Sequence, residues 1–151
     1  MVKIKYYKQE TDWTCGAACM VMVLDHFKHR NSEKRVAKLL NTNKVIGTRE
    51  KAFPELCEQL KLDYVVERRA SLNEIKTYLK KNFVVIVRYE LIQDRVEHYT
   101  VIHSIGKKYM YLHDPILGPD HRLTIAYFRR VWRSKREKEL HWFIAIKNPR
   151  K

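Results

Sequence analysis

The pattern of apolar and polar residues predicts helices mainly in the first half of the chain. The segment from Gly16 to Phe27, GAACMVMVLDHF, is apolar almost all round, as expected for a helix buried in a core. Four further helices are predicted, each preceded by a hydroxyl residue able to cap it. Two of them lie at 32–40 and 49–61, with Ser32 and Thr48 as candidate N-caps. A third begins at the capping box Ser71–Glu74 and runs to about residue 81, and Thr124 caps a short helix that ends at Trp132.

The second half of the chain is dominated by patterns typical of strands. The β-branched run 83–87 suits a central strand. Other strands are predicted at 2–7, 62–67, 97–105, 108–113 and 142–146, with a turn-rich loop over 114–119. Helices first and mostly antiparallel strands later indicate an α+β fold. Since the chain has no repeat or flexible linker, we expect one domain over residues 1–151.

Cysteine content and charge bear on compartment and partners. Three cysteines among 151 residues are an odd number, which excludes a full disulfide framework and favours a reducing compartment. The sequence shows neither the apolar N-terminal stretch of a signal peptide nor a run of about 18 apolar residues, so we expect a soluble, cytoplasmic protein. A formal net charge of +14 favours an anionic partner, or simply solubility.

Cys15 is the first candidate for chemistry. It follows a polar, irregular segment and opens the apolar helix. The positive end of a helix dipole lowers the pKa of a thiol, and the thiolate is the nucleophilic form. Gly16 permits close backbone packing there, and Ala17 and Ala18 leave space beside the sulfur. Many cysteines are only packing residues, so a partner base is needed to make the case.

Hairpin geometry selects a base from the seven histidines. If strands 97–105 and 108–113 turn about Gly106, His98 faces Asp114 across the ladder. A carboxylate at that distance can orient an imidazole, whereas His103 and His113 have no such partner in this register. A slip of one residue would move a side chain to the other face. We therefore predict that His98 and Asp114 act together.

These residues fit the pattern of nucleophile, base and orienting carboxylate. Cys15 would attack a carbonyl, His98 would take the thiol proton and return it to the leaving amine, and Asp114 would fix the imidazole. Gln9, six residues before Cys15, can donate a neutral hydrogen bond to an oxyanion, with the backbone N–H of Cys15 as second donor. We expect neither a metal nor an organic cofactor.

Two blocks of the sequence resemble the double-glycine leader peptidases, family thirty-nine of the cysteine peptidases, which process bacteriocins. The first block is QETDWTCGAAC over 9–19 with the apolar stretch that follows, and the second is HYTVI over 98–102 with YLHDP over 111–115 and Gly118. Phe128 and Trp132 also lie where family members often carry Phe and Trp. The resemblance spans nearly the whole chain.

This resemblance implies a papain-like cysteine peptidase fold, with N-terminal helices packed on a mostly antiparallel sheet. It implies a triad of Cys15, His98 and Asp114, with Gln9 in the oxyanion hole, and cleavage of a peptide bond, often after Gly-Gly in a leader peptide. Two features depart from the family. Thr14 occupies a position that is often Asp, and the transporter parts to which many members are fused are not in this sequence. The resemblance also implies a membrane transporter as a partner.

Three alternatives stay open at this point. A zinc site would have to recruit Cys15, Cys19 and histidines, but no complete four-ligand pattern occurs. A nucleic-acid or other anionic-partner binding module would use the basic run RRVWRSKREK over 129–138. The same triad could also serve a papain-like acyltransferase or another amidohydrolase. Cys19 and Cys57 both lie in helical apolar patterns and are interpreted as core residues.

Overall fold

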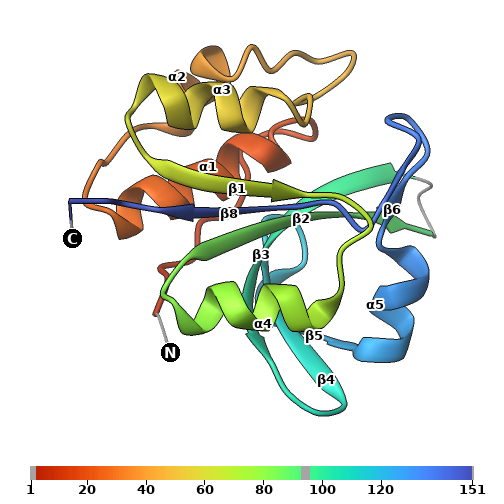
Figure 1. Cartoon of the computed structure of the whole chain (residues 1–151). Coiled ribbons are helices and arrows are strands. Elements are labelled where there is room, and N and C mark those ends of the chain that lie inside the picture. The colour runs from red at the N-terminus through yellow and green to blue at the C-terminus, as the bar shows by residue number, and fades with distance from the viewer. Residues whose placement is uncertain (1–2, 93–95, 151) are drawn as a thin grey trace.

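A six-stranded antiparallel sheet runs through the molecule in the order β1-β8-β2-β3-β4-β5, and the computed structural model describes residues 3–92 and 96–150. Helices α1, α2 and α3 lie on one side of the sheet and α4 and α5 on the other (Figure 1). The helices are α1 Cys15–His26, α2 Glu33–Leu39, α3 Ala52–Gln59, α4 Leu72–Lys80 and α5 Ile125–Val131. The strands are β1 Asp63–Glu67, β2 Val84–Leu91, β3 Val96–Ile105, β4 Tyr109–Asp114, β5 Gly118–Thr124 and β8 Phe143–Lys147, with a small separate hairpin of β6 Arg133–Ser134 and β7 Glu139–Leu140.

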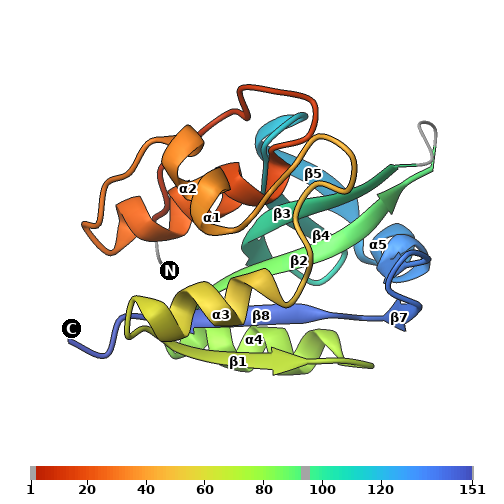
Figure 2. The ribbon, with the colours of Figure 1, turned by 90° about the horizontal axis from the view of Figure 1, so that it is seen from above.

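Strand β2, which contains the predicted β-branched run, is buried on both faces of the sheet. Val84 and Ile86 pack with α1–α3 in one core, while Val85, Val87 and Tyr89 pack with α4 and α5 in the other. Because successive side chains point to opposite faces, a strand buried on both sides must be apolar without alternation. Figure 2 shows α3 lying over β8, which pairs with β2 on the side away from β3. The predicted α+β class is confirmed.

Most predicted helices and their caps are observed. Ser32 and Thr124 accept backbone N–H bonds from Arg35 and Tyr127, and Ser71 and Glu74 form the reciprocal capping box. Thr48 is not an N-cap: α3 begins only at Ala52. The Thr48 side chain instead hydrogen-bonds that of Thr42 (2.6 Å). Within the described residues, no helix has the length and apolar character needed to cross a membrane.

The predicted strand at 2–7 and the loop at 114–119 were wrong in part. Residues 3–7 form no ladder. The segment is tied to β4 through side chains, since the His113 ring donates to the Ile4 carbonyl (2.8 Å) and the Tyr6 hydroxyl to the Asp114 carbonyl (2.7 Å). The loop after Asp114 is short, and Gly118 already begins β5, whose polar sequence GPDHRLT gives little strand signal.

The β3–β4 register differs from the prediction by two residues. Val101 pairs with His113, which brings Thr100 rather than His98 level with Asp114. A β-bulge between Ile102 and Ser104 shifts the rest of the ladder by one further residue. A displacement of two keeps the same face, so His98 and Asp114 still meet, now diagonally across the hairpin.

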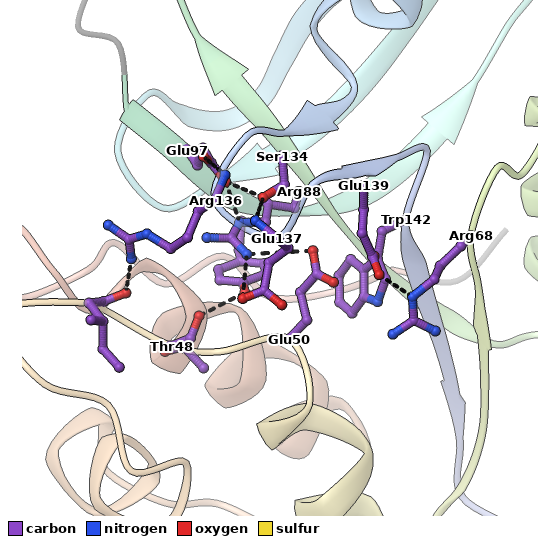
Figure 3. A network of polar contacts seen from close by, with 12 residues as sticks. Thr48, Glu50, Arg68, Arg88, Glu97, Ser134, Arg136, Glu137, Glu139 and Trp142 are labelled. Atoms are coloured by element: carbon purple, nitrogen blue, oxygen red, sulfur yellow. Dashed lines mark hydrogen bonds and ion pairs between the residues drawn. The ribbon is translucent and has the colours of Figure 1, made fainter.

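A buried charge cluster joins the β6–β7 hairpin to the sheet beside α3. Arg88 of β2 is 4% exposed and lies 3.5 Å from Glu50 and 3.3 Å from Glu97, with its guanidinium over the Tyr99 ring. Figure 3 shows Glu137 and Glu139 of the hairpin completing the cluster. Carboxylates therefore outnumber the central cation, and burial together with the neighbouring Glu139 carboxyl raises the pKa of Glu50 to about 8.

This raised pKa predicts that the cluster weakens the fold as pH rises. Glu50 binds its proton more tightly in the folded chain than in the unfolded one, so its contribution is lost progressively from the unfolded pKa near 4.5 to about 8. Glu50→Gln should remove this dependence and raise stability at about pH 8 by a few kcal/mol, on the order given by the shift. Urea unfolding across this pH range is the measurement.

Glu55→Gln, at an exposed position on α3, is the matched control and should follow wild type. A parallel pH dependence in Glu50→Gln and wild type would show that Glu50 does not carry the buried proton.

Candidate active site

Cys15 and His98 face a common cleft of about 290 Å³ between the helical side of the molecule and the sheet. The remaining lining comes from the segments on either side of the cleft and includes Asp12, Trp13, Lys44, Val45, Ile46, Gly47, Thr48, Arg88, Val96, Glu97, Tyr99, Ile116 and Arg136. Val45, Val96 and Ile116 are exposed apolar residues at this cleft, so a bound chain would meet apolar side chains next to charged ones.

The start of α1 fits closely against its surroundings at Cys15. A Cβ atom on Gly16 would lie 2.7 Å from the Thr48 hydroxyl and 3.2 Å from the Phe53 ring, so only glycine allows this approach. Burial acts to raise the pKa of the Cys15 thiol, but the hydrogen bond and charge of His98, with the N–H groups of Tyr99 and Gly16, lower it below its usual value. Cys15 is thus set up as a thiolate.

His98 is almost fully buried, at 1% exposure, and has a partner on each side of its ring. Its Nε2–H donates to Asp114 Oδ1 (2.7 Å), which leaves Nδ1 for the Cys15 sulfur. Burial acts to lower the pKa of His98, but the hydrogen bonds and negative charges of Asp114 and Cys15 raise it to about 10. At neutral pH this geometry favours a thiolate–imidazolium pair.

Asp114 is fully buried yet well supplied with donors. Besides His98, the Tyr89 hydroxyl donates to Oδ2, and the backbone N–H groups of Ile116 (2.9 Å) and Leu117 (3.0 Å) donate to Oδ1. Burial acts to raise the pKa of Asp114, but the hydrogen bond and charge of His98, helped by Tyr89, lower it. The carboxylate therefore remains ionised and holds the imidazole ring in place.

Gln9 lies beside the turn that follows Asp114, because its backbone N–H donates to the Pro115 carbonyl (3.0 Å). Its side-chain Nε2 donates to the Thr11 carbonyl (2.6 Å), and its buried Oε1 has no hydrogen-bond partner among the described residues. An amide nitrogen carries two hydrogens, so one donor remains. No contact of Gln9 brings it into the Cys15–His98–Asp114 array itself.

Sequence patterns did not single out Tyr89, although it contacts both His98 and Asp114. Tyr89 pairs with His98 across the β2–β3 ladder, with the rings 5.8 Å apart, and burial beside Asp114 raises the pKa of its hydroxyl. In the sequence it follows the apolar run 83–87 and lies between Arg88 and Glu90, where nothing distinguishes it from an aromatic residue of the core. Only the three-dimensional pairing of β2 with β3 reveals its role.

The other two cysteines belong to the core. Cys19 of α1 and Cys57 of α3 are fully buried, and burial raises the pKa of Cys57 to about 12 and that of Cys19 well above its usual value. Neither is in a disulfide. Both are therefore unreactive thiols in the folded chain, in keeping with the interpretation from sequence.

One group of potential metal ligands occurs in the described residues, away from Cys15. His103, His113 and Asp120 have ligand atoms within 4.8 Å of one another. Both His113 nitrogens are already engaged, by the Ile4 carbonyl and the Asp120 N–H, and the two rings stack at 4.4 Å with an 18° angle. Nearly parallel rings do not aim their lone pairs at one point. His113 ties the N-terminal segment to β4, while His103 pairs with Asp120, a carboxylate partner that the predicted register did not give it.

The basic run at 129–138 is partly used within the chain. Arg133 and Lys135 pair with Glu90 (3.0 and 3.7 Å), and Arg136 donates to the Ile46 carbonyl. These contacts connect the hairpin to β2 and to the cleft wall.

Comparison with known proteins agrees with the geometry. The model of the Peptidase C39 family matches residues 3–135. Over 133 residues the chain is 26% identical to the lactococcin-G-processing and transport ATP-binding protein LagD of Lactococcus lactis. The aligned residues make up 87% of this chain but only 18% of LagD.

Solved structures share the fold. The double-glycine-motif protease of an AMS/PCAT transporter, in complex with the leader peptide, superposes with a TM-score of 0.73 at 19% identity, covering 97% of this chain and 93% of that one. The peptidase domain of Streptococcus ComA, a bifunctional ABC transporter, gives 0.73 at 20% identity, covering 98% and 99%. The expected papain-like fold is confirmed, and the family match over most of its length shows that this chain belongs to the Peptidase C39 family of cysteine peptidases.

Proposed function

We propose that this chain cleaves a peptide bond in a leader peptide through a Cys15–His98–Asp114 triad. The observation that supports the triad best is the chain of hydrogen bonds from the Cys15 sulfur through His98 to buried Asp114 at the cleft. Cys15 attacks the scissile carbonyl carbon, the imidazolium of His98 protonates the leaving amine, and the resulting thioester is hydrolysed by a water that His98 deprotonates. Asp114 keeps the imidazole oriented throughout.

Gln9 and the start of α1 are proposed to bind the oxyanion. The first N–H groups of a helix have no partner within the helix, so that of Cys15 is free to donate. The unused hydrogen on Gln9 Nε2 would supply the second bond. Since the side chain is neutral, it stabilises the developing charge without competing with the imidazolium.

The substrate class follows from the relatives rather than from the cleft. A relative solved with its leader peptide and one that processes lactococcin G favour a leader that ends in a double glycine. We propose that the chain acts on such a peptide in the cytoplasm, together with a membrane transporter. The surface charge of +14 would suit an acidic segment of the substrate or partner.

The pH dependence of Cys15 alkylation tests its activation. Cys15 should react with iodoacetamide at pH values below its usual pKa, while buried Cys19 and Cys57 should stay unlabelled in the folded chain. In His98→Ala the labelling of Cys15 should move to alkaline pH, because burial then acts unopposed. Turnover should appear above the lowered pKa of Cys15 and disappear as pH rises through about 10, where His98 loses its proton.

His103→Ala, which removes a histidine on the same strand but outside the cleft lining, is the matched control. Peptide mass spectrometry resolves the three cysteines. Alkylation of Cys15 that is unchanged in His98→Ala would remove His98 from the mechanism.

The oxyanion role of Gln9 predicts a loss in kcat alone. Gln9→Ala should lower kcat about 10²–10³-fold, the usual effect of removing one oxyanion donor, with little change in KM. Its Cys15 alkylation profile should match wild type, because Gln9 contacts neither the thiol nor His98. Steady-state kinetics and alkylation together decide the point, and a kcat near wild type would assign the oxyanion to other donors.

The substrate proposal predicts cleavage after Gly-Gly. A leader-type peptide with Gly-Gly before a short cargo should be cut once, after the second glycine, and replacement of either glycine by valine should lower kcat/KM more than 10-fold. Cys15→Ala should give no product. Mass spectrometry with and without an added amine separates a free carboxylate product, which we expect, from an amide, which would favour the acyltransferase alternative.

A further inference from the structure

Glu33 is a buried carboxylate outside the triad, and its side-chain hydrogen bonds within the described residues go to the loop before Cys15. It is the first residue of α2 and is 7% exposed. Its Oε2 accepts the backbone N–H of Glu10 (2.8 Å) and the hydroxyl of Thr14 (2.9 Å). A buried carboxylate is costly unless its donors are well placed, so these two bonds define where the loop lies.

The hydrogen bonds around Thr14 have one consistent direction. A carboxylate only accepts, so the single Thr14 hydroxyl proton goes to Glu33. Thr14 Oγ1 must then accept, from the Thr11 hydroxyl (2.7 Å) and the Thr11 N–H (3.2 Å). Trp13 N–H in turn donates to Thr11 Oγ1 (3.3 Å). Glu33 therefore organises the whole segment from Glu10 to Thr14.

This segment leads directly into the helix that carries the nucleophile. The Thr14 carbonyl accepts the N–H of Ala18 (2.9 Å), at the start of α1, and Thr14 is itself 3% exposed. Thr14 precedes α1 without a side-chain cap bond to that helix, because its oxygen already accepts from Thr11 while its proton goes to Glu33. The carboxylate on α2 thus fixes the residue next to Cys15.

Capping of α2 does not account for this arrangement. Ser32 already caps α2, accepting the N–H of Arg35 (3.2 Å). An acidic residue in the first turn of a helix also interacts favourably with the helix dipole. The dipole needs no hydrogen-bond partner for the carboxylate, whereas Glu33 accepts two bonds from the loop that precedes α1.

We infer that Glu33 is a positioning residue for Cys15, acting through Thr14 to hold the nucleophile at the correct place and angle beside His98. The inference rests on the proposed function for its effect on turnover. Glu33 itself contacts neither the substrate nor the reacting atoms. Its consequence is that the carboxylate and the hydroxyl are interchangeable across their hydrogen bond, provided that one of each is present.

Exchange of the two groups is the test. Thr14→Asp alone places two carboxylates against each other in a buried site, and Glu33→Thr alone leaves Thr14 without its charged acceptor. Each should lower kcat at least about 10-fold with KM nearly unchanged, since misplacement by about 1 Å is costly. The double variant Thr14→Asp/Glu33→Thr restores the bond between a carboxylate and a hydroxyl, although the Glu10 N–H loses its acceptor. It should therefore recover part of the loss, in both kcat and the rate of Cys15 alkylation.

Two further variants separate positioning from general stability. Ser32→Ala removes the cap of α2 and should lower the melting temperature while leaving Cys15 alkylation in the folded chain unchanged. Glu33→Gln keeps the shape and one acceptor oxygen, so it should fold even where a larger change does not, with a smaller loss of kcat than Glu33→Thr.

Wild-type alkylation and kcat in Glu33→Thr, or a double variant no better than either single one, would overturn the inference. Alkylation requires no peptide substrate. A chain that cuts no peptide but whose Cys15 reactivity still depends on Glu33 would count against the proposed function alone.

Discussion

The buried carboxylate of Asp114 is the constraint on which the site depends. A fully buried charge is tolerated only where hydrogen-bond donors replace water, and Asp114 has four, from His98, Tyr89 and the N–H groups of Ile116 and Leu117. These donors come from β2, β3 and the turn after β4, so satisfying one carboxylate fixes three parts of the chain relative to one another. The orientation of His98 follows from that requirement.

The same end of β4 also anchors the segment that leads to Cys15. Ile4, Tyr6 and Gln9 are held to His113, Asp114 and Pro115 through side-chain and backbone bonds rather than a ladder. From the other direction, Glu33 of α2 holds residues 10–14. Cys15 is therefore fixed from both sides, by the sheet through its N-terminal segment and by the helical layer through Glu33.

Sequence patterns predicted the features that depend on local residue chemistry or on which face of a strand a side chain occupies. The apolar helix after Cys15, the caps at Ser32, Ser71 and Thr124, and the run of β2 could all be recognised because each has a residue pattern of its own. The pairing of His98 with Asp114 was expected for a register that proved to be displaced by two residues. It was preserved because side chains alternate along a strand, and a displacement of two returns to the same face.

Features that depend on long-range partners could not be predicted. Tyr89 looks like a core aromatic and Glu33 like a surface residue opening a helix until the tertiary structure shows their hydrogen-bond partners. Strand β5 was missed because its sequence is polar and contains Pro119. Thr48 was misassigned as a cap because its partner, Thr42, lies before it. Buried polar contacts of this kind are specified by the assembled fold and leave little pattern in the sequence.

The central claim is that Cys15 and His98 rest as an ion pair, and ¹⁵N NMR of the His98 ring tests it most directly. At about pH 8 the account predicts that both ring nitrogens carry a proton, because the negative charges of Asp114 and Cys15 hold the pKa of His98 near 10. In Cys15→Ala the pKa should fall, since one of those charges is gone. A neutral His98 ring at about pH 8 in the wild-type chain would contradict the ion pair and with it the proposed activation of the nucleophile.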